Sequence, residues 1–203
     1  MTLDEIKLYL PKFLSPTSER QLFEELERFP GNIDQRFYTH RLWEEQTIFQ
    51  GDGIKDLLVV NLPSPEIRPT PSMILSNTCD ISVENERPFP SALCYAPIFN
   101  LHKYREGLLK RGIHNPQSID NHLQAIRRQR VTQIFYLPKG DRLEQESLVF
   151  LDRICSCRND SVSRSDLTEK RLFTLSNFGL WVFLLKLSIH LTRFNNKADR
   201  LSG

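Results

Sequence analysis

Five short apolar runs, each bounded by proline, glycine or other turn-forming residues, constrain the fold of this chain more than any other feature. They lie at residues 54–62, 73–75, 91–99, 131–138 and 147–157. Short runs rich in Val, Ile, Leu and Phe between turn-forming residues are typical of buried β-strands. The sequence therefore predicts a core of five or six mostly antiparallel strands.

Segments with helical signals surround these runs. A Ser-Pro pair at residues 15–16 supplies an N-cap and a first helical position, and Pro-Gly at 30–31 ends the segment. Further helices are expected at 101–110, 118–129 and 177–194. Helices that flank an antiparallel strand core indicate the α+β class.

The length of 203 residues allows a core that needs no disulfide or metal for stability. We expect a single domain over residues 1–203. It would have an N-terminal helical extension at 1–45, a β core with two inserted helices at 46–158 and a C-terminal helical segment at 165–197. The N-terminus lacks the apolar segment of a secretory signal, and Lys186 interrupts the longest uncharged run near the C-terminus. A cytoplasmic protein with no membrane contact is therefore expected.

The two halves of the chain carry opposite charge. Residues 1–100 contain 9 Lys and Arg against 15 Asp and Glu, whereas residues 101–203 contain 18 against 10. The basic half predicts either an anionic partner or attraction between the halves. The residues predicted to hold nucleic-acid phosphates are Lys110, Arg111, Arg127, Arg128 and Arg130. Tyr104, Phe135 and Tyr136 would offer faces for base stacking, and the alternative is a solvated helical surface.

The stretch SMILSNTCDIS, residues 72–82, joins an apolar run to a cluster of reactive side chains. Ser76, Asn77, Cys79 and Asp80 supply a hydroxyl, an amide, a thiol and a carboxylate. With a histidine nearby, Cys79 would be a nucleophile, and the stretch would border an active site. Alternatively, the polar side chains bond their own backbone in a turn while the thiol packs as a small apolar group.

Metal and cofactor sites are not expected. Cys155 and Cys157 would lie on one face of a strand, but a zinc site needs further ligands at compatible spacing. The chain contains neither a Gly-rich phosphate loop nor an HExxH element. Core packing is the expected role of these two cysteines.

The words QGDGIKDLLVVNLPSPEIRPTPSMILSN and YAPIFNL resemble the PemK/MazF-type toxins, which are compact β-barrels that cut single-stranded RNA. The resemblance covers about residues 50–100 and implies a small barrel-like core of the SH3/PemK type. It also implies a pocket lined by Arg68, Ser76, Asn77 and Asp80. In the family an Arg directly precedes a Pro and a Thr follows Pro-Ile, whereas Thr70 and Phe99 stand at these places here. Catalysis therefore stays open.

These observations lead to three hypotheses about function. The first is a single-stranded RNA-binding protein related to toxin-type ribonucleases, endoribonuclease-like if active, in a bacterial toxin–antitoxin or phage-defence system. In the second, the protein is a non-catalytic subunit that docks on a protein partner, or on a second copy as a homodimer, through residues 177–194. The third is a Cys79-dependent enzyme. The first predicts binding that weakens steeply with salt, and the second predicts an exposed apolar helix face.

Overall fold

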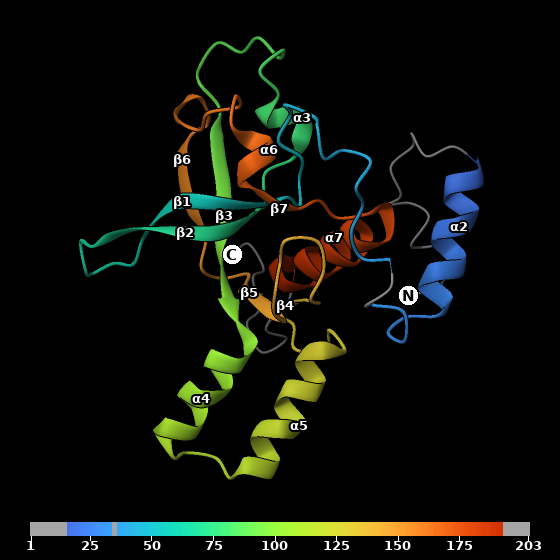
Figure 1. Cartoon of the computed structure of the whole chain (residues 1–203), viewed down its shortest axis with the longest axis vertical. Coiled ribbons are helices and arrows are strands. Elements are labelled where there is room, and N and C mark those ends of the chain that lie inside the picture. Colours follow the sequence, from blue (N-terminus) through green and yellow to red (C-terminus); the bar gives the residue numbers. More distant parts are fainter. Residues whose placement is uncertain (1–15, 34–35, 193–203) are drawn as a thin grey trace, which may run out of the picture.

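The computed structural model of the chain describes residues 16–33 and 36–192 (Figure 1). This part contains six α-helices and a sheet of seven strands, and every strand pair is antiparallel. The predicted α+β class with a mostly antiparallel core is confirmed. The division of residues 1–203 into an extension, a core and a C-terminal segment stays a prediction.

The elements follow one another along the chain. They are α2 (Pro16–Glu27), β1 (Gly53–Val60), β2 (Ile67–Ile74), α3 (Thr78–Ile81), β3 (Ala92–Asn100), α4 (Leu101–Arg111), α5 (Pro116–Arg127), β4 (Ile134–Leu137), β5 (Ser147–Phe150), β6 (Cys155–Arg158), the 3₁₀ turn η1 (Asn159–Ser161), α6 (Leu167–Lys170), β7 (Arg171–Phe173) and α7 (Asn177–Thr192).

The strands form the order β4-β5-β3-β2-β1-β7, and β6 pairs with β3 beside this path. β3 is the longest strand, and it pairs with β2 on one edge and with β6 and β5 in succession on the other. Within the described residues no pairing joins β4 to β7. The sheet is therefore open, and the closed barrel implied by the resemblance is not observed.

β2 runs through a segment in which prolines at positions 63, 65, 69 and 71 predict a stiff loop. The strand begins at Ile67 and contains Pro69 and Pro71. Ile74 donates its backbone N–H to the carbonyl of Asp52 on the β1 side. Successive residues of a strand point their backbone N–H groups to alternate edges, so the nitrogens at positions 69 and 71 face the edge away from β1. β3 pairs with β2 only at residues 72–74. The prolines therefore lie where β2 is an edge strand and needs no donor.

The run at 147–157 forms two strands instead of the predicted single one. β5 ends in a turn in which Arg153 donates its N–H to the carbonyl of Phe150. β6 then resumes on the same edge of β3, where Cys155 opposes Tyr95. Asp152 and Arg153 place one charge on each face of the predicted strand, and these two successive charges are the sign of the interruption in the sequence.

Two apolar clusters cover the two faces of the sheet. Met73 packs in the larger cluster with α5 and α7, whereas its neighbour Ile74 packs in the smaller one with Ile81 of α3 and Leu167 beside it. Successive side chains of a strand point to opposite faces, which explains the separation. Cys155 and Cys157 pack against the smaller cluster, in agreement with their predicted place on one strand face.

Helices α4 and α5 form an antiparallel hairpin that projects from the sheet (Figure 1). Asn100 and Asn115 cap their N-termini, and Gly112 ends α4 with a left-handed backbone, φ 64°. This conformation suits glycine because it has no Cβ. The two helices are joined by hydrogen bonds between the side chains of Arg105 and Asp120, and of Tyr104 and His122.

Helix α7 is buried in its own chain over its first half, where Trp181 and Phe183 are among the core residues. In the sequence, the spacing of Lys186, His190, Arg193 and Lys197 predicts a basic stripe on this helix, which would either form its exposed edge or contact acidic groups. Neither interpretation holds for Lys186, which is buried and donates from Nζ to the carbonyl of Gln129. Residues 193 and 197 of that stripe lie outside the described residues. No helix in residues 16–33 and 36–192 has the length and apolar character required to cross a membrane.

Candidate functional site

The side chains of Ser76 and Asn77 accept hydrogen bonds from backbone N–H groups. Ser76 Oγ accepts the N–H of Cys94 at 2.7 Å, so it fixes the end of β2 against β3. Asn77 Oδ1 accepts the N–H of Cys79 at 2.9 Å and caps the short helix α3. These bonds account for the two side chains as parts of a turn.

Cys79 and Asp80 are both exposed on α3. Asp80 forms an ion pair of 2.7 Å with Arg87. The thiol of Cys79 has no hydrogen-bond partner among the described residues. The structure therefore shows no activating base for Cys79, and its role as a nucleophile stays a prediction.

Arg68 lies at the other end of β2. It opposes Val59 in the β1–β2 ladder and is ion-paired to the neighbouring Glu66. An extended strand rises about 3.3 Å per residue, so roughly 20 Å separates Arg68 from Ile74, where β2 ends. The structure therefore does not bring Arg68 together with residues 76–80 in one pocket.

The five basic residues predicted to contact nucleic acid fall into two groups. Lys110 and Arg111 are exposed at the tip of the α4–α5 hairpin, whereas the second group, residues 127–130, lies where the chain returns to the sheet. The 12 residues of α5 separate the groups by roughly 18 Å at about 1.5 Å per residue. The two groups form the ends of an elongated surface.

Arg127 differs from the other four because it has an internal partner. Its Nε and Nη2 donate to the two carboxylate oxygens of Glu146 at 2.7 and 2.8 Å, and the Tyr136 hydroxyl donates to the same carboxylate at 2.6 Å. The hydrogen bond from Arg127 lowers the pKa of Glu146, and the same bond raises the pKa of Arg127. Arg127 therefore attaches the base of the hairpin to the sheet and is poorly placed for phosphate binding.

Two of the three aromatic residues expected to stack bases are not available at the surface. Phe135 and Tyr136 are core residues of β4, at 0% and 3% exposure. Tyr104 is half-buried, packs edge-on against Phe150 and bonds to His122. The base-stacking part of the prediction is therefore wrong for Phe135 and Tyr136.

What remains on the hairpin is an exposed and mainly cationic surface, termed the hairpin surface. Its exposed cations are Lys103, Lys110, Arg111, Arg128 and Arg130. Glu106 is exposed beside His102, and Asp120 is paired with Arg105. The hairpin surface is the candidate nucleic-acid interface of the chain.

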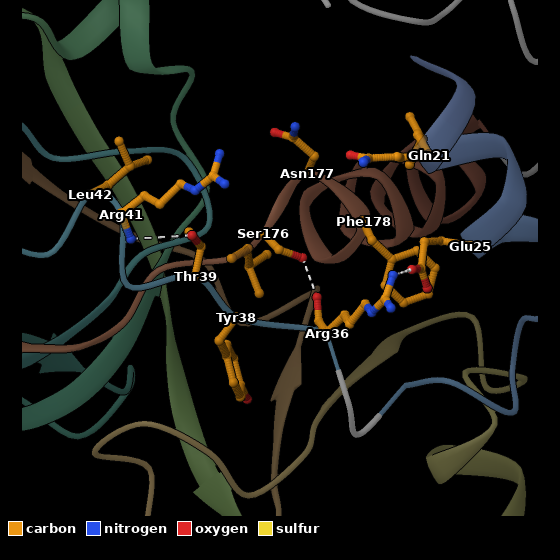
Figure 2. A pocket seen from close by; sticks show the side chains of 12 residues that line it. Gln21, Glu25, Arg36, Tyr38, Thr39, Arg41, Leu42, Ser176, Asn177 and Phe178 are labelled. Carbon is orange, nitrogen blue, oxygen red and sulfur yellow. Dashed lines mark hydrogen bonds and ion pairs between the residues drawn. The ribbon is translucent and has the colours of Figure 1, made fainter. Parts of the chain in front are cut away.

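Two polar features lay outside the sequence predictions. One is a buried network around Asp52 and Arg171, which joins β1 to β7. The other is a cavity between α2, residues 36–42 and the start of α7 (Figure 2). The acidic residues Glu24, Glu25 and Glu27 predict a solvated face of α2, but Glu25 is buried. Its position three residues after the buried Leu22, on the same side of the helix, is the signal in the sequence that points to its burial.

In the described ranges, no group of three or more His, Cys, Asp and Glu side chains is arranged to hold a metal ion. Comparison of the chain with protein-family models and with curated proteins gives no match. The resemblance to the PemK/MazF-type toxins therefore rests on the quoted words alone.

Proposed function

We propose that the protein binds nucleic acid by the phosphate backbone, with the hairpin surface as the contact. The observation that carries the proposal is that the α4–α5 hairpin projects from the sheet (Figure 1) and that five exposed cations lie on it or directly after it. Cations on a projecting element neutralise phosphates and release counterions, which supplies affinity without base recognition. Burial of Phe135 and Tyr136 favours backbone contacts over base stacking.

The proposal concerns binding and leaves cleavage aside. Arg68 and residues 76–80 lie at opposite ends of β2, so a shared pocket of the toxin type has no support. Preference for single-stranded RNA, and a role in a toxin–antitoxin or phage-defence system, rest on the resemblance. Single-stranded RNA is therefore the first substrate to test, with a duplex of the same sequence beside it.

The test is binding of labelled single-stranded RNA at a series of salt concentrations in the presence of EDTA. Each lost phosphate contact lowers the slope of log affinity against log salt by about 0.7 for a single strand. The double variant Lys110→Ala/Arg111→Ala and the double variant Arg128→Ala/Arg130→Ala should each weaken binding and reduce the slope. The control is Lys55→Ala/Lys139→Ala, which removes two exposed cations elsewhere.

Affinity that is independent of salt would overturn the proposal, as would hairpin variants that bind like the control. Arg127→Ala is unsuitable as a binding test because it also removes the bond to Glu146. Loss of RNA fragments on Arg68→Ala would instead support a ribonuclease. The assay therefore follows both bound and cleaved RNA.

Docking through residues 177–194 is the second candidate. Ile189 and Leu191 are 43% and 65% exposed near the end of α7, which favours a contact there. The first half of the helix is buried in its own chain. A partner or a second copy would therefore meet the last turns of α7, and association that is lost in Ile189→Asp would support this role.

A further inference from the structure

The cavity of Figure 2 has a volume of about 530 Å³ and lies away from the hairpin surface. Three segments that are distant in sequence form it: α2, residues 36–42 and residues 175–178. Its volume falls within the range of about 300–1,000 Å³ that is typical of small-molecule sites. Its walls combine charged groups, carboxamides and apolar side chains.

The charged part of the wall has an excess of one cation. Glu25 is buried; its carboxylate accepts Asn32 Nδ2 at 2.6 Å and forms an ion pair with Arg36 Nη1. This pair orients Arg36 and leaves its other N–H groups without a protein partner in the described ranges. Arg41 has no ion pair or side-chain hydrogen bond with any described residue, and it extends toward the cavity in Figure 2. Both arginines are exposed to solvent, and with Glu25 they give the wall a net charge of +1.

The apolar part of the wall consists of Leu22, Leu175 and Phe178, which are 2%, 5% and 4% exposed. The carboxamides of Gln21 and Asn177 lie at the rim (Figure 2). Because Ser176 Oγ accepts the N–H of Gly179, the start of α7 is already capped. The attraction for an anion therefore comes from the two arginines, and α7 serves to position Asn177.

We propose that this cavity binds a small organic anion. Its carboxylate or phosphate group pairs with Arg41 and with the free N–H groups of Arg36, and its apolar body packs on Leu22, Leu175 and Phe178. A guanidinium is suited to both oxyanions because its N–H groups match their geometry. The site is separate from the proposed nucleic-acid interface and does not depend on it.

Four compounds test the proposal by titration calorimetry. Adenosine 5′-monophosphate and indole-3-acetate each combine an anionic group with a flat body, adenosine lacks the anion, and inorganic phosphate lacks the body. We expect saturable binding of at least one of the first two, with adenosine and phosphate much weaker. Which of the two binds distinguishes a phosphate ligand from a carboxylate ligand.

Variants then locate the binding. Arg41→Ala should weaken it at least about tenfold, as expected for loss of a charged hydrogen bond worth about 1.5–3 kcal/mol. Arg20→Ala, an exposed cation of α2 outside the lining, should bind like the natural protein. Lys110→Ala/Arg111→Ala should also bind normally, which excludes binding of the nucleotide at the hairpin surface. Amide NMR shifts on titration should concentrate at residues 39–42 and 176–178.

Failure of all four compounds to bind saturably at millimolar concentration would overturn the proposal. Equal affinity of Arg41→Ala and Arg20→Ala would also overturn it, because the anion would then lie elsewhere. Phosphate that binds as tightly as the nucleotide would overturn the role of the apolar wall. None of these results bears on RNA binding at the hairpin surface.

Discussion

Arg171 and Asp52 form an ion pair of 3.3 Å in which neither side chain is exposed to solvent. The remaining N–H groups of the guanidinium donate to backbone carbonyls of the segment that precedes β1; the acceptors are Leu42, Trp43, Glu45 and Thr47. Thr174 Oγ1 and the N–H of Phe49 donate to the Asp52 carboxylate. Burial raises the pKa of Asp52 to about 6, although Arg171 opposes the rise. One side chain therefore ties β7, β1 and residues 42–47 together.

Replacement of Arg171 should be among the most destabilising changes in the chain. Arg171→Met leaves a buried carboxylate and four carbonyls without their donor, so we expect a loss of about 3–5 kcal/mol in the free energy of unfolding. Urea denaturation measures it. Arg158→Ala, which breaks an exposed ion pair with Asp160, should leave the midpoint unchanged. Equal midpoints for the two variants would contradict a structural role of the buried pair.

Lys186 should make stability depend on pH. Burial lowers its pKa from 10.5 to about 7, so between these values the unfolded chain binds a proton that the folded chain has released. Stability therefore rises with pH through this window. Below about pH 7 the buried charge costs roughly 5 kcal/mol, from about 1.4 kcal/mol per pKa unit.

The variant Lys186→Met lacks this titration. The difference in unfolding free energy between Lys186→Met and the natural protein should favour the variant most near about pH 6, and it should shrink steadily toward about pH 10. Lys139→Met, at an exposed position, supplies the comparison for the loss of a lysine side chain. If the difference between Lys186→Met and the natural protein does not change with pH, burial does not lower the pKa of Lys186.

Two helical glycines should respond in opposite ways to alanine. A Cβ on Gly179 would lie 2.3 Å from the carbonyl oxygen of Phe37, so α7 would have to move away from that segment. We expect a loss of about 1–3 kcal/mol, as for overpacking. A Cβ on Gly107 meets nothing within 4 Å, so alanine there should add about 0.5–1 kcal/mol. Thermal unfolding of both variants checks the signs, and stabilisation by Gly179→Ala would refute the close contact.

Cys79 should be the first thiol to react with a disulfide reagent such as DTNB. It is exposed, whereas Cys94, Cys155 and Cys157 are half-buried. In Cys79→Ser the fast phase of the reaction should contain one thiol fewer per chain. The substitution should leave the affinity for RNA unchanged. Loss of a measurable activity on modification of Cys79 alone would instead revive the thiol-enzyme hypothesis.

Much of the fold could be predicted because its signals are local. Neighbouring residues are enough to identify the apolar runs at 54–62 and 91–99. The same holds for the start of α2 at Pro16 and the end of α4 at Gly112. β7 could not be found this way, since three residues carry no periodicity and their partners lie more than a hundred positions earlier. Nor does the sequence show that Arg127 would be ion-paired with Glu146. This pair removes Arg127 from the five predicted contact residues, and exposed Lys103 joins the four that remain.

The cavity shows the same limit. Each of its charged residues looks like ordinary surface when read in sequence, and only the approach of α2 and α7 makes them neighbours. Lys186 was expected on a basic stripe because residues at 186, 190, 193 and 197 share one helical face. Lys186 is buried and donates to the carbonyl of Gln129, a contact between distant segments that the helix period cannot reveal.

The pairing of β1 with β7 has a consequence for synthesis of the chain. Gly53 opposes Phe173 and Ile54 opposes Arg171 in that ladder, so a growing polypeptide contains the complete β1–β2 hairpin long before the strand that covers the first two residues of its outer edge has been made. During that interval the edge of β1 and the carboxylate of Asp52 face water, or any chaperone at the tunnel exit. The time needed to synthesise residues 75–173 therefore sets how long Asp52, Gly53 and Ile54 remain without their β7 partners.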